Sequence, residues 1–586
     1  MSEIKLSRLS VSAFVAAVVL VGGLPFLGAP SRASADVGME SPEVAWIQQF
    51  RAEASQYDWI NAADAAGNLY VAGTTTGTLP GQVLAGGPDV FIRKYDVAGN
   101  IVWTSQFGSV AGDEAAGILV HGFGLYVWGH AWNALPDQTW AGSSDVYVRL
   151  YDLDGNELWT RQFGSAGYDS VRGLAADDSG MYVVGTARMA FPGQTKTSPD
   201  NDAFVRKYDP DGNELWTREF GATGVWYATT FPMAVALDGS AMYVAGSAAG
   251  ALLGQTWAGF SDAFVRKYDS NGNDLWTRQF GSAGSDETTA FFVDASGVKI
   301  AGTAWNALPG QTWAGSSDVY VRAYDPDGAE LWTRQFGSSA SDFVSSFAFD
   351  SSGTYVAGTT SGVLPGQTRV GGTDAYIRKH DGNGNDLWTR QFGSAASDSV
   401  ARIEVDFTGV YVAGGTLGAL PGQTWAGLRD AYVRKYDHAG NEAWTLQIGT
   451  AAIETVFSIA TEFTDVYLVG ATRGAFPGFM SDGTSNALVL KIAFTPRQKI
   501  SLCAGLVEDL MSAGILNRGE DNSLLVKLAG ADAQLERGNP IPAMNILHAF
   551  VNEVNALVQS GRLSRAQGWL LAGLAANAVE QIQTGG

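Results

Sequence analysis

A unit of about 56 residues recurs eight times along the chain, and this period limits the folds that are open to it. Each copy is marked by a Trp in a run such as Leu-Trp-Thr-Arg-Gln-Phe. Successive marked positions are 57, 56, 57, 60, 56, 56 and 56 residues apart, at Trp46, Trp103, Trp159, Trp216, Trp276, Trp332, Trp388 and Trp444. A fixed period of this length predicts a repeat architecture in which each copy is one supersecondary unit.

A β-hairpin forms the centre of each unit. In one copy, Ala263 to Tyr268 is rich in β-forming residues, and a second such run ends at Phe280. Between them lies Asn271-Gly272-Asn273, whose residues tolerate the positive φ that tight hairpin turns require. Two further β-prone runs and one longer loop complete the unit, so we expect four short strands in each copy.

Four antiparallel strands repeated around an axis predict an all-β propeller, because this arrangement covers both faces of every blade and leaves only short edges. The last unit ends at Asn486 to Lys491 without a closing Trp strand, while Val44 to Phe50 supplies such a strand at the other end of the chain. We expect these segments to pair and close a ring of eight blades, with seven as the alternative. A parallel β-helix is disfavoured, since its rungs are shorter and need no hairpin turns.

The first 35 residues have the pattern of a secretory signal peptide. Lys5 and Arg8 precede an apolar run from Val11 to Leu27, and Ala33-Ser-Ala35 provides a cleavage site. The alternative is a retained membrane anchor. Since no second apolar run of spanning length follows, we expect a soluble chain from residue 36 that is secreted or held at the cell surface. Its one cysteine, Cys503, excludes an internal disulfide framework.

The composition changes after Pro496, where turn glycines become rare and helical periodicity begins. Gly514, Gly538 and Gly561 follow the first three periodic segments, as expected at helix C-termini. The division is therefore a signal peptide at 1–35, a propeller at 36–495 and a helical domain at 496–586. The expected helices cover residues 500–513, 522–537, 543–560 and 564–583.

These motifs resemble two known families. The strand Gly353 to Thr359, the Asp-Ala-Phe-Val-Arg-Lys-Tyr-Asp run and the Gly-Asn-Glu-Leu-Trp turn resemble SBBP β-propeller repeats of exported bacterial proteins. The family name implies seven blades, whereas this chain offers eight copies. The C-terminal part resembles the FIMAH-type helical domain, on Gly514 to Asn517, Ser523 to Leu528, Gly538-Asn539 and Ala549 to Val554. The resemblances imply an exported, often multidomain surface protein with an accessory helical module, and they carry no catalytic motif.

The net charge of −22 resides almost entirely in the propeller region. Such a negative field repels phosphate backbones, so a nucleic acid partner is not expected.

Two sets of aspartates and one set of arginines recur with the period. We expect the aspartates to accept backbone N–H bonds in turns and to pair with the arginines. Each arginine shares a strand face with a Phe or Tyr two positions earlier, which predicts guanidinium groups stacked between blades. The aspartates are Asp113, Asp169, Asp286, Asp342 and Asp398, and then Asp89, Asp145, Asp202, Asp262, Asp318, Asp374 and Asp430; the arginines are Arg93, Arg149, Arg206, Arg266, Arg322, Arg378 and Arg434.

Two hairpin turns resemble the opening of an EF-hand calcium loop, which gives a weak metal hypothesis. The residues are Asp152, Asp154 and Asn156, and likewise Asp209, Asp211 and Asn213. An EF-hand also needs a bidentate Glu at its twelfth position, where the first loop has Phe163. Tight turns explain these residues more simply, so calcium stays a minor hypothesis and no other cofactor is expected.

The longest loop of the unit contains Leu308-Pro-Gly-Gln-Thr312, which recurs with variation in the other copies, and four copies have a Trp directly after it. Exposed Trp would offer stacking surfaces to sugar rings or apolar partners, and repetition around a ring would make weak sites multivalent. The simpler alternative is burial of each indole against the neighbouring blade. The four are Trp140, Trp257, Trp313 and Trp425.

Familiar catalytic patterns are absent from the sequence, which has no H-E-x-x-H spacing, no G-x-S-x-G elbow and no Walker loop. We therefore name no catalytic residue and expect a non-enzymatic binding or adhesion scaffold at the cell surface or outside the cell, with carbohydrate or a surface protein as its partner. The alternatives are an extracellular polysaccharide-active enzyme with its site in the central channel, and a purely structural spacer.

Overall fold

The computed structural model describes residues 42–584 apart from 51–55, 64–67, 240 and 482. The expected signal peptide and its cleavage site lie outside the described residues.

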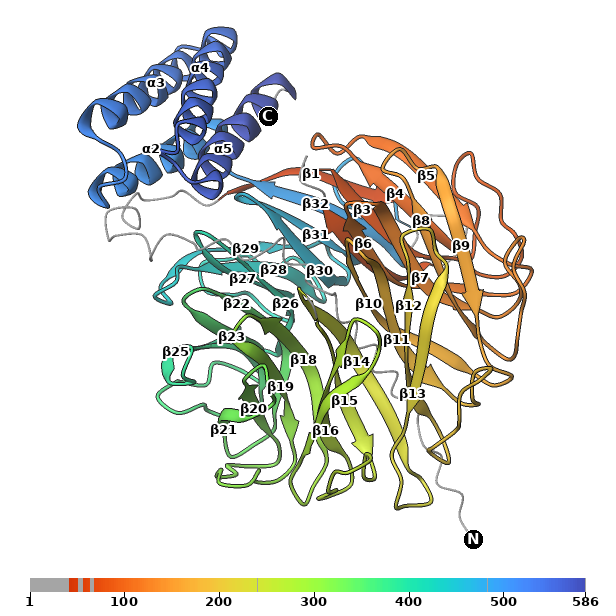
Figure 1. The fold of residues 1–586 in the computed structure, drawn as a ribbon. Coiled ribbons are helices and arrows are strands. Elements are labelled where there is room, and N and C mark those ends of the chain that lie inside the picture. The colour runs from red at the N-terminus through yellow and green to blue at the C-terminus, as the bar shows by residue number, and fades with distance from the viewer. Residues whose placement is uncertain (1–41, 51–55, 64–67, 240, 482, 585–586) are drawn as a thin grey trace.

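Eight four-stranded antiparallel sheets form the propeller, as predicted (Figure 1). The fifth blade is typical. Its strands β18(Asp286–Asp294), β19(Gly297–Ala304), β20(Asp318–Tyr324) and β21(Glu330–Phe336) lie in chain order. The first strand of each blade contacts the first strand of the next, so these strands surround the axis and the fourth strands form the outer wall.

The other blades follow the same order. Their strands are β2(Gln56–Ala63), β3(Leu69–Thr75), β4(Asp89–Tyr95), β5(Ile101–Phe107); β6(Asp113–His121), β7(Gly124–Ala131), β8(Asp145–Tyr151), β9(Glu157–Phe163); β10(Asp169–Asp177), β11(Gly180–Ala187), β12(Asp202–Tyr208), β13(Glu214–Phe220); β14(Thr229–Asp238), β15(Ala241–Ala249), β16(Asp262–Asp269), β17(Asp274–Phe280); β22(Asp342–Asp350), β23(Gly353–Thr360), β24(Asp374–His380), β25(Asp386–Phe392); β26(Asp398–Asp406), β27(Gly409–Thr416), β28(Asp430–Tyr436), β29(Glu442–Ile448); and β30(Glu454–Glu462), β31(Asp465–Thr472), β32(Asn486–Ala493) with β1(Glu43–Phe50).

The ring closes by joining the two ends of the propeller region. Strand β1 pairs antiparallel with β32, with Ile47 opposite Leu490, and completes the eighth blade. This confirms the pairing expected between the N-terminal Trp strand and the last hairpin. Since the pairing bridges the whole ring, the first and last blades are held as one cooperative unit.

The second and third strands of each blade are buried on both faces, because neighbouring blades cover them. Every residue of β19 and β20 is buried. The repeated arginines lie between blades as predicted, and Arg322 stacks over Phe280 of the preceding blade at 4.0 Å. The same stacking occurs for Arg93 on Phe50, Arg149 on Phe107, Arg206 on Phe163, Arg266 on Phe220, Arg378 on Phe336 and Arg434 on Phe392.

The two faces of the propeller differ in the length of their connections. One face, here called the loop face, carries the loops between second and third strands, such as 305–317, and the connections between blades, such as 337–341. The two segments contact each other there, since the Asp342 N–H donates to the Ser317 oxygen at 3.0 Å. The opposite face, the turn face, carries only tight hairpin turns.

Four helices follow the propeller, as expected: α2(Pro496–Ser512), α3(Arg518–Glu536), α4(Pro540–Gln559) and α5(Arg565–Thr584). Gly514, Gly538 and Gly561 adopt positive φ after the first three, which confirms them as helix ends. The first two helices begin four residues before the predicted starts. The reason is capping, because Thr495 and Asn517 each form a capping box with the third helical residue.

The helical bundle docks on the turn face, near β31 and β32 (Figure 1). Phe463, in the turn before β31, packs against Trp569 of α5 with ring centroids 4.7 Å apart. Beside it, the buried Asp465 carboxylate pairs with Lys499 of α2 at 2.8 Å and with Lys491 of β32 at 2.9 Å. This contact leaves the loop face free of the bundle. Within the described residues, no helix is long and apolar enough to cross a membrane.

Candidate functional site

The long loops on the loop face are held by a repeated pair of glutamines. Gln335 of β21 accepts a hydrogen bond from the Leu308 N–H at 2.9 Å, and its own N–H donates to Gln311 Oε1 at 3.1 Å. Its amide nitrogen also donates to Asp318 Oδ2 at 3.1 Å. Such bonds preorganise the loop before any ligand arrives. The sequence analysis missed this role, although both glutamines recur with the period.

Three of the four predicted loop Trp residues are half exposed to an equal degree. Trp140, Trp313 and Trp425 have exposed fractions of 47%, 46% and 47%. Trp257 is more buried, and its Nε1 has no hydrogen-bond partner among the residues that the structure describes. The alternative of burial against the neighbouring blade therefore fails for three positions. These three indoles lie at equivalent places on the loop face.

Other apolar side chains, which the sequence analysis did not single out, enlarge this exposed surface. Trp226 lies in the connection between the third and fourth blades and is 87% exposed. Leu253, Phe260, Leu428 and Met480 lie in the long loops and are exposed as well. These side chains add apolar area to the loop face.

The two sets of repeated aspartates meet beneath these loops. Asp318 opens β20 and Asp342 opens β22 of the next blade, and both are fully buried. As predicted, they accept backbone N–H bonds: Asp318 from Ala314 at 2.9 Å and Asp342 from Ser338 at 2.6 Å. Burial raises the pKa of Asp342, and at equivalent places it raises the pKa of Asp113 to about 7 and of Asp286 to about 6.

The expected pairing of these aspartates with the repeated arginines is wrong. Arg322 instead pairs at 3.5 Å with Glu330, the first residue of the outer strand in its own blade. Five other arginines pair in the same way, with Glu157, Glu214, Asp274, Asp386 and Glu442. The guanidinium groups lie over the inter-blade Phe rings and form their ion pairs with the outer strand.

The residues of the weak calcium hypothesis lie in hairpin turns on the turn face. Asp152 accepts hydrogen bonds from the N–H groups of Asp154 and Asn156 at 3.0 and 2.8 Å, and from the Asn156 side chain at 2.8 Å. The bonds from Asn156 hold the pKa of Asp152 below its usual value. Asp209, Asp211 and Asn213 occupy the same turn in the next blade, where Asn213 bonds Asp209. The carboxylates of Asp152 and Asp209 are thus used within the turn, as the simpler interpretation expects.

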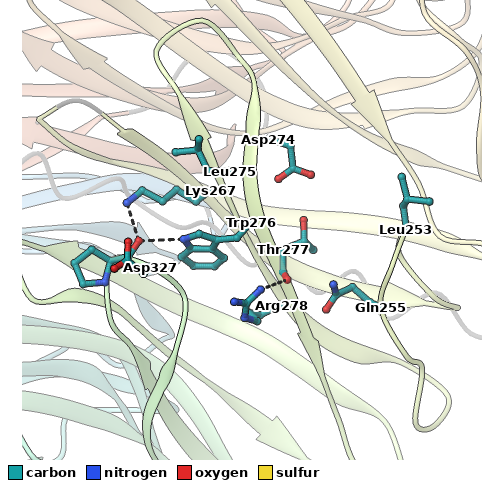
Figure 2. A pocket seen from close by; sticks show the side chains of 10 residues that line it. Leu253, Gln255, Lys267, Asp274, Leu275, Trp276, Thr277, Arg278 and Asp327 are labelled. Carbon is teal, nitrogen blue, oxygen red and sulfur yellow. Dashed lines mark hydrogen bonds between the residues drawn. The ribbon is translucent and has the colours of Figure 1, made fainter.

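A groove of about 610 Å³ lies on the outer wall between the fourth and fifth blades (Figure 2). Trp276, Arg278 and Asp274 line one side and Asp327 the other. Figure 2 shows that the groove is bridged by Lys267 and Trp276, which both donate to the main-chain oxygen of Pro326. These residues recur at other junctions, so we assign the groove to the contact between blades.

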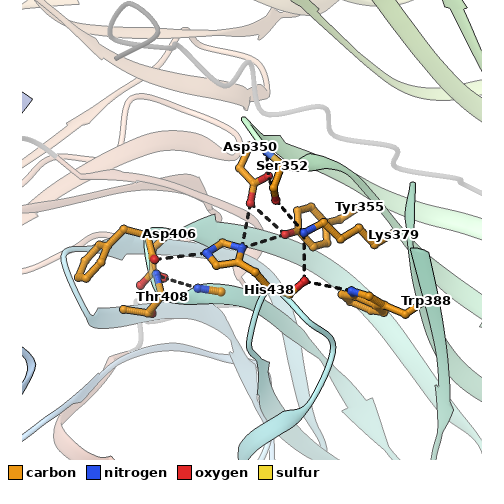
Figure 3. Close-up of polar contacts among 10 residues, drawn as sticks. Asp350, Ser352, Tyr355, Lys379, Trp388, Asp406, Thr408 and His438 are labelled. Carbon is orange, nitrogen blue, oxygen red and sulfur yellow. Dashed lines mark hydrogen bonds and ion pairs between the residues drawn. The ribbon is translucent and has the colours of Figure 1, made fainter. Parts of the chain in front are cut away.

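One polar cluster on the turn face contains a histidine (Figure 3). Tyr355 donates to Asp350 at 2.9 Å, and His438 of the next blade lies 3.0 Å from both. Although burial opposes it, the hydrogen bonds from His438 and Ser352 hold the pKa of Asp350 below its usual value.

The tyrosine and aspartate of this cluster recur elsewhere, as Tyr411 with Asp406 and Tyr243 with Asp238. The cluster is therefore the repeated turn arrangement with one histidine added. Among the residues that the structure describes, no group of three or more His, Cys, Asp or Glu side chains could hold a metal ion.

Comparison with known proteins supports the assignment of the repeat. Residues 331–365, from β21 to the loop after β23, match the SBBP family model, described as a beta-propeller repeat. One repeat-length segment of the chain is thus similar to an SBBP propeller repeat. The resemblance expected from the sequence is confirmed for the propeller, and a helical bundle follows it as expected.

A curated relative and two solved structures are also similar. The regulatory protein FlaEY of Caulobacter vibrioides is 27% identical over 368 residues, which cover 55% of this chain and 38% of that protein. The chain thus matches less than two fifths of that relative's length. A Penicillium chrysogenum α-L-arabinanase has a TM-score of 0.31 and 11% identity, over 59% of this chain and 96% of its own. The polysaccharide lyase Uly1 has a TM-score of 0.36 and 10% identity, over 77% of this chain and 99% of its own. At these scores the structures carry no argument about activity.

Proposed function

We propose that this chain is an exported, non-enzymatic scaffold that binds an extended polysaccharide through its loop face. The observation that carries the proposal is the equal half-exposure of Trp140, Trp313 and Trp425 on three separate blades. An indole offers a flat apolar face to the C–H face of a sugar ring and keeps an N–H for a hydroxyl group. Export is an expectation from the first 35 residues of the sequence.

The ring arrangement favours a polymer over a small sugar. Each indole alone is a weak site, but a polymer held by one blade reaches the next indole as an intramolecular event, which raises the overall affinity without new contacts. The glutamine-held loops reduce the ordering cost of binding, because Gln335 fixes the loop at Leu308 in the free protein. Docking of the helical bundle on the turn face leaves the loop face open for a ligand of this size.

The non-enzymatic part of the proposal rests on the polar clusters of the described residues. The groove at Trp276 and the cluster at His438 both repeat an arrangement found in other blades, and a role repeated in this way is usually architectural. An enzyme would instead need unlike groups with separate acid and base roles in one cleft.

The experiment is a binding screen of residues 36–586 against bacterial and plant polysaccharides, with release of reducing ends or unsaturated products followed in parallel. We expect saturable binding without turnover, and at least a tenfold loss of affinity in a Trp313→Ala, Trp425→Ala double variant. The matched control is Leu275→Ala, Leu331→Ala, which removes two exposed apolar side chains from the outer wall. Turnover of a polymer would favour the enzyme alternative. Binding to no polymer by the folded chain would exclude the proposal and favour a surface-protein partner or a structural spacer.

A further inference from the structure

Five junctions between blades bring two buried aspartates to the same glycine. At Gly337, an added methyl group would collide with Asp318 Oδ1 and lie 2.9 Å from Asp342 Oδ2. Both carboxylates are fully buried. The other four pairs are Asp89 with Asp113 at Gly108, Asp145 with Asp169 at Gly164, Asp262 with Asp286 at Gly281, and Asp374 with Asp398 at Gly393.

Every pair contains a carboxylate oxygen that has no hydrogen-bond partner among the described residues. Oδ2 of Asp318 accepts from Ala314 and Gln335, and Oδ2 of Asp342 accepts from Ser338. In the described part of the chain, Oδ1 of both residues has no hydrogen-bond partner. At least one such Oδ1 occurs in every pair, the others being those of Asp89, Asp113, Asp145, Asp262 and Asp398. Burying a carboxylate oxygen without a hydrogen-bond partner costs free energy, so we expect a bound group that offsets this cost.

The nearby arginines form no ion pair with these carboxylates, although their charge opposes the rise in the pKa of Asp113, Asp169 and Asp286. Arg322 pairs with Glu330 and stacks over Phe280, and the equivalent arginines do the same at the other junctions. No ion pair among the described residues joins a lysine or arginine to any member of the five pairs. Two adjacent buried carboxylates cannot both stay ionised without a counter-charge.

The third blade shows where such a charge is placed. There the second aspartate is replaced by Thr230, and the loop Trp is replaced by Lys196. The Lys196 ammonium lies 3.4 Å from Oδ1 of Asp202, the residue equivalent to Asp318. At this junction the chain itself provides a cation beside Oδ1 of Asp202, which also accepts from the Ser198 N–H; the equivalent oxygens of Asp89, Asp145, Asp262 and Asp318 have no hydrogen-bond partner among the described residues.

We propose that each of the five aspartate pairs binds a divalent cation of the Ca²⁺ type between consecutive blades. Carboxylate oxygens are the ligands that Ca²⁺ prefers, and main-chain oxygens or water complete its shell of six to eight. The proposal concerns sites on the loop face, distinct from the hairpin turns of Asp152 and Asp209. It does not depend on polysaccharide binding.

The position of the sites gives the cation a structural effect on the loop face. Asp318 Oδ2 accepts from the N–H of Ala314, the residue directly after Trp313. A cation on Oδ1 of the same carboxylate therefore orders the loop that presents the indole, and it joins that loop to the next blade through Asp342.

The test is the metal content of residues 36–586, stripped with EGTA, reloaded in about 1 mM Ca²⁺ and measured by mass spectrometry after removal of free ion. We expect several Ca²⁺ per chain, up to the five pairs, and a rise in melting temperature on loading. Asp318→Asn with Asp342→Asn should lower the content by one, while the control Asp152→Asn should leave it unchanged.

Metal content of the unaltered chain decides the proposal even where a variant fails to fold. Less than one Ca²⁺ per folded chain, with no change in melting temperature, would overturn it. The two carboxylates of each pair would then share a proton instead of a cation. Loss of Ca²⁺ in Asp152→Asn with no loss in the double variant would overturn it as well, and would place the ion in the hairpin turns. None of these readouts involves a polysaccharide.

Discussion

The Trp276 indole donates a hydrogen bond from Nε1 to the main-chain oxygen of Pro326, 3.0 Å away in the next blade. Its ring covers Gly328, which adopts a φ of 79° and leaves no room for a side chain. Lys267 donates to the same oxygen at 2.9 Å. Equivalent bonds join Trp46 to Val97, Trp103 to Leu153, Trp159 to Pro210, Trp216 to Ser270, Trp332 to Gly382 and Trp388 to His438. The residue that defines the repeat thus also connects the blades.

Changing Trp276 should weaken the contact between the fourth and fifth blades. We expect Trp276→Phe to lower the free energy of unfolding by about 1 kcal/mol, because it removes one hydrogen bond. Trp276→Ala should cost about 2 to 4 kcal/mol, since ring contacts with Tyr243 and Tyr324 are lost as well. Urea denaturation measures both values. Leu275→Ala, in an exposed neighbour, is the control and should change stability by less than about 0.5 kcal/mol.

Attachment of the helical bundle should depend on Asp465. Its buried carboxylate pairs with Lys491 and Lys499, so Asp465→Asn leaves two lysines without their counter-charge. We expect this change to weaken the attachment of the bundle by about 3 to 5 kcal/mol of free energy. We expect faster amide exchange in α2 and α5 while the propeller keeps its protection. The control Asp532→Asn breaks an exposed pair with Arg497 inside the bundle and should have little effect. Unchanged exchange in Asp465→Asn would show that apolar contacts such as Phe463 with Trp569 hold the bundle alone.

A pH dependence should come from Glu219, which replaces the loop-holding glutamine in the third blade. Burial raises the pKa of Glu219 from 4.5 to about 7, opposed by the hydrogen bond from Phe191 and reinforced by the charge of Asp202. The folded chain binds this proton more tightly than the unfolded chain does. The stability that protonated Glu219 contributes is therefore complete below about pH 4.5 and is lost as the pH rises through about 7. Glu219→Gln should therefore stabilise the chain by about 1 to 2 kcal/mol near pH 8 and by much less near pH 5. Equal effects at both pH values would contradict this assignment.

The loops should lose their order when the glutamine pair is broken. Gln335→Ala removes the side-chain bonds to Leu308 and Asp318, which costs about 1 to 3 kcal/mol locally, while the main-chain bond to Gln311 can persist. We expect faster amide exchange at 308–314 and weaker polysaccharide binding, with the far side of the ring unchanged. Gln581→Ala, in the helical bundle, is a control that leaves the loop face intact. Normal exchange in the altered loop would show that the turn residues alone hold it.

Most of the fold could be predicted from the sequence, because a strict period fixes both the unit and its number. The Trp spacing predicts eight blades, and the unpaired strand from Val44 to Phe50 predicts closure with β32. The predicted starts of α2 and α3 lie four residues after the observed starts, because the caps at Thr495 and Asn517 lie outside the apolar periodicity.

The site was less predictable, because it depends on contacts between blades. The exposed fraction of Trp313 depends on how the loops pack in three dimensions, and the repeat pattern does not contain this information. The pairing of Asp318 with Asp342 was missed for the same reason, as Arg322 was an equally good partner by sequence. Trp226 occurs in only one of the connections between blades, so the repeat pattern does not indicate its exposure.

The most direct test of the central claim is the ratio of affinities for a polysaccharide and for its short oligosaccharide, measured by calorimetry on residues 36–586. We predict that the affinity for the polymer is at least about 100-fold higher per binding event, and that it falls to the oligosaccharide value in the Trp313→Ala, Trp425→Ala double variant. The Leu275→Ala, Leu331→Ala control should keep the full ratio. Equal affinities for polymer and oligosaccharide, or a ratio that survives loss of both indoles, would contradict a multivalent loop face.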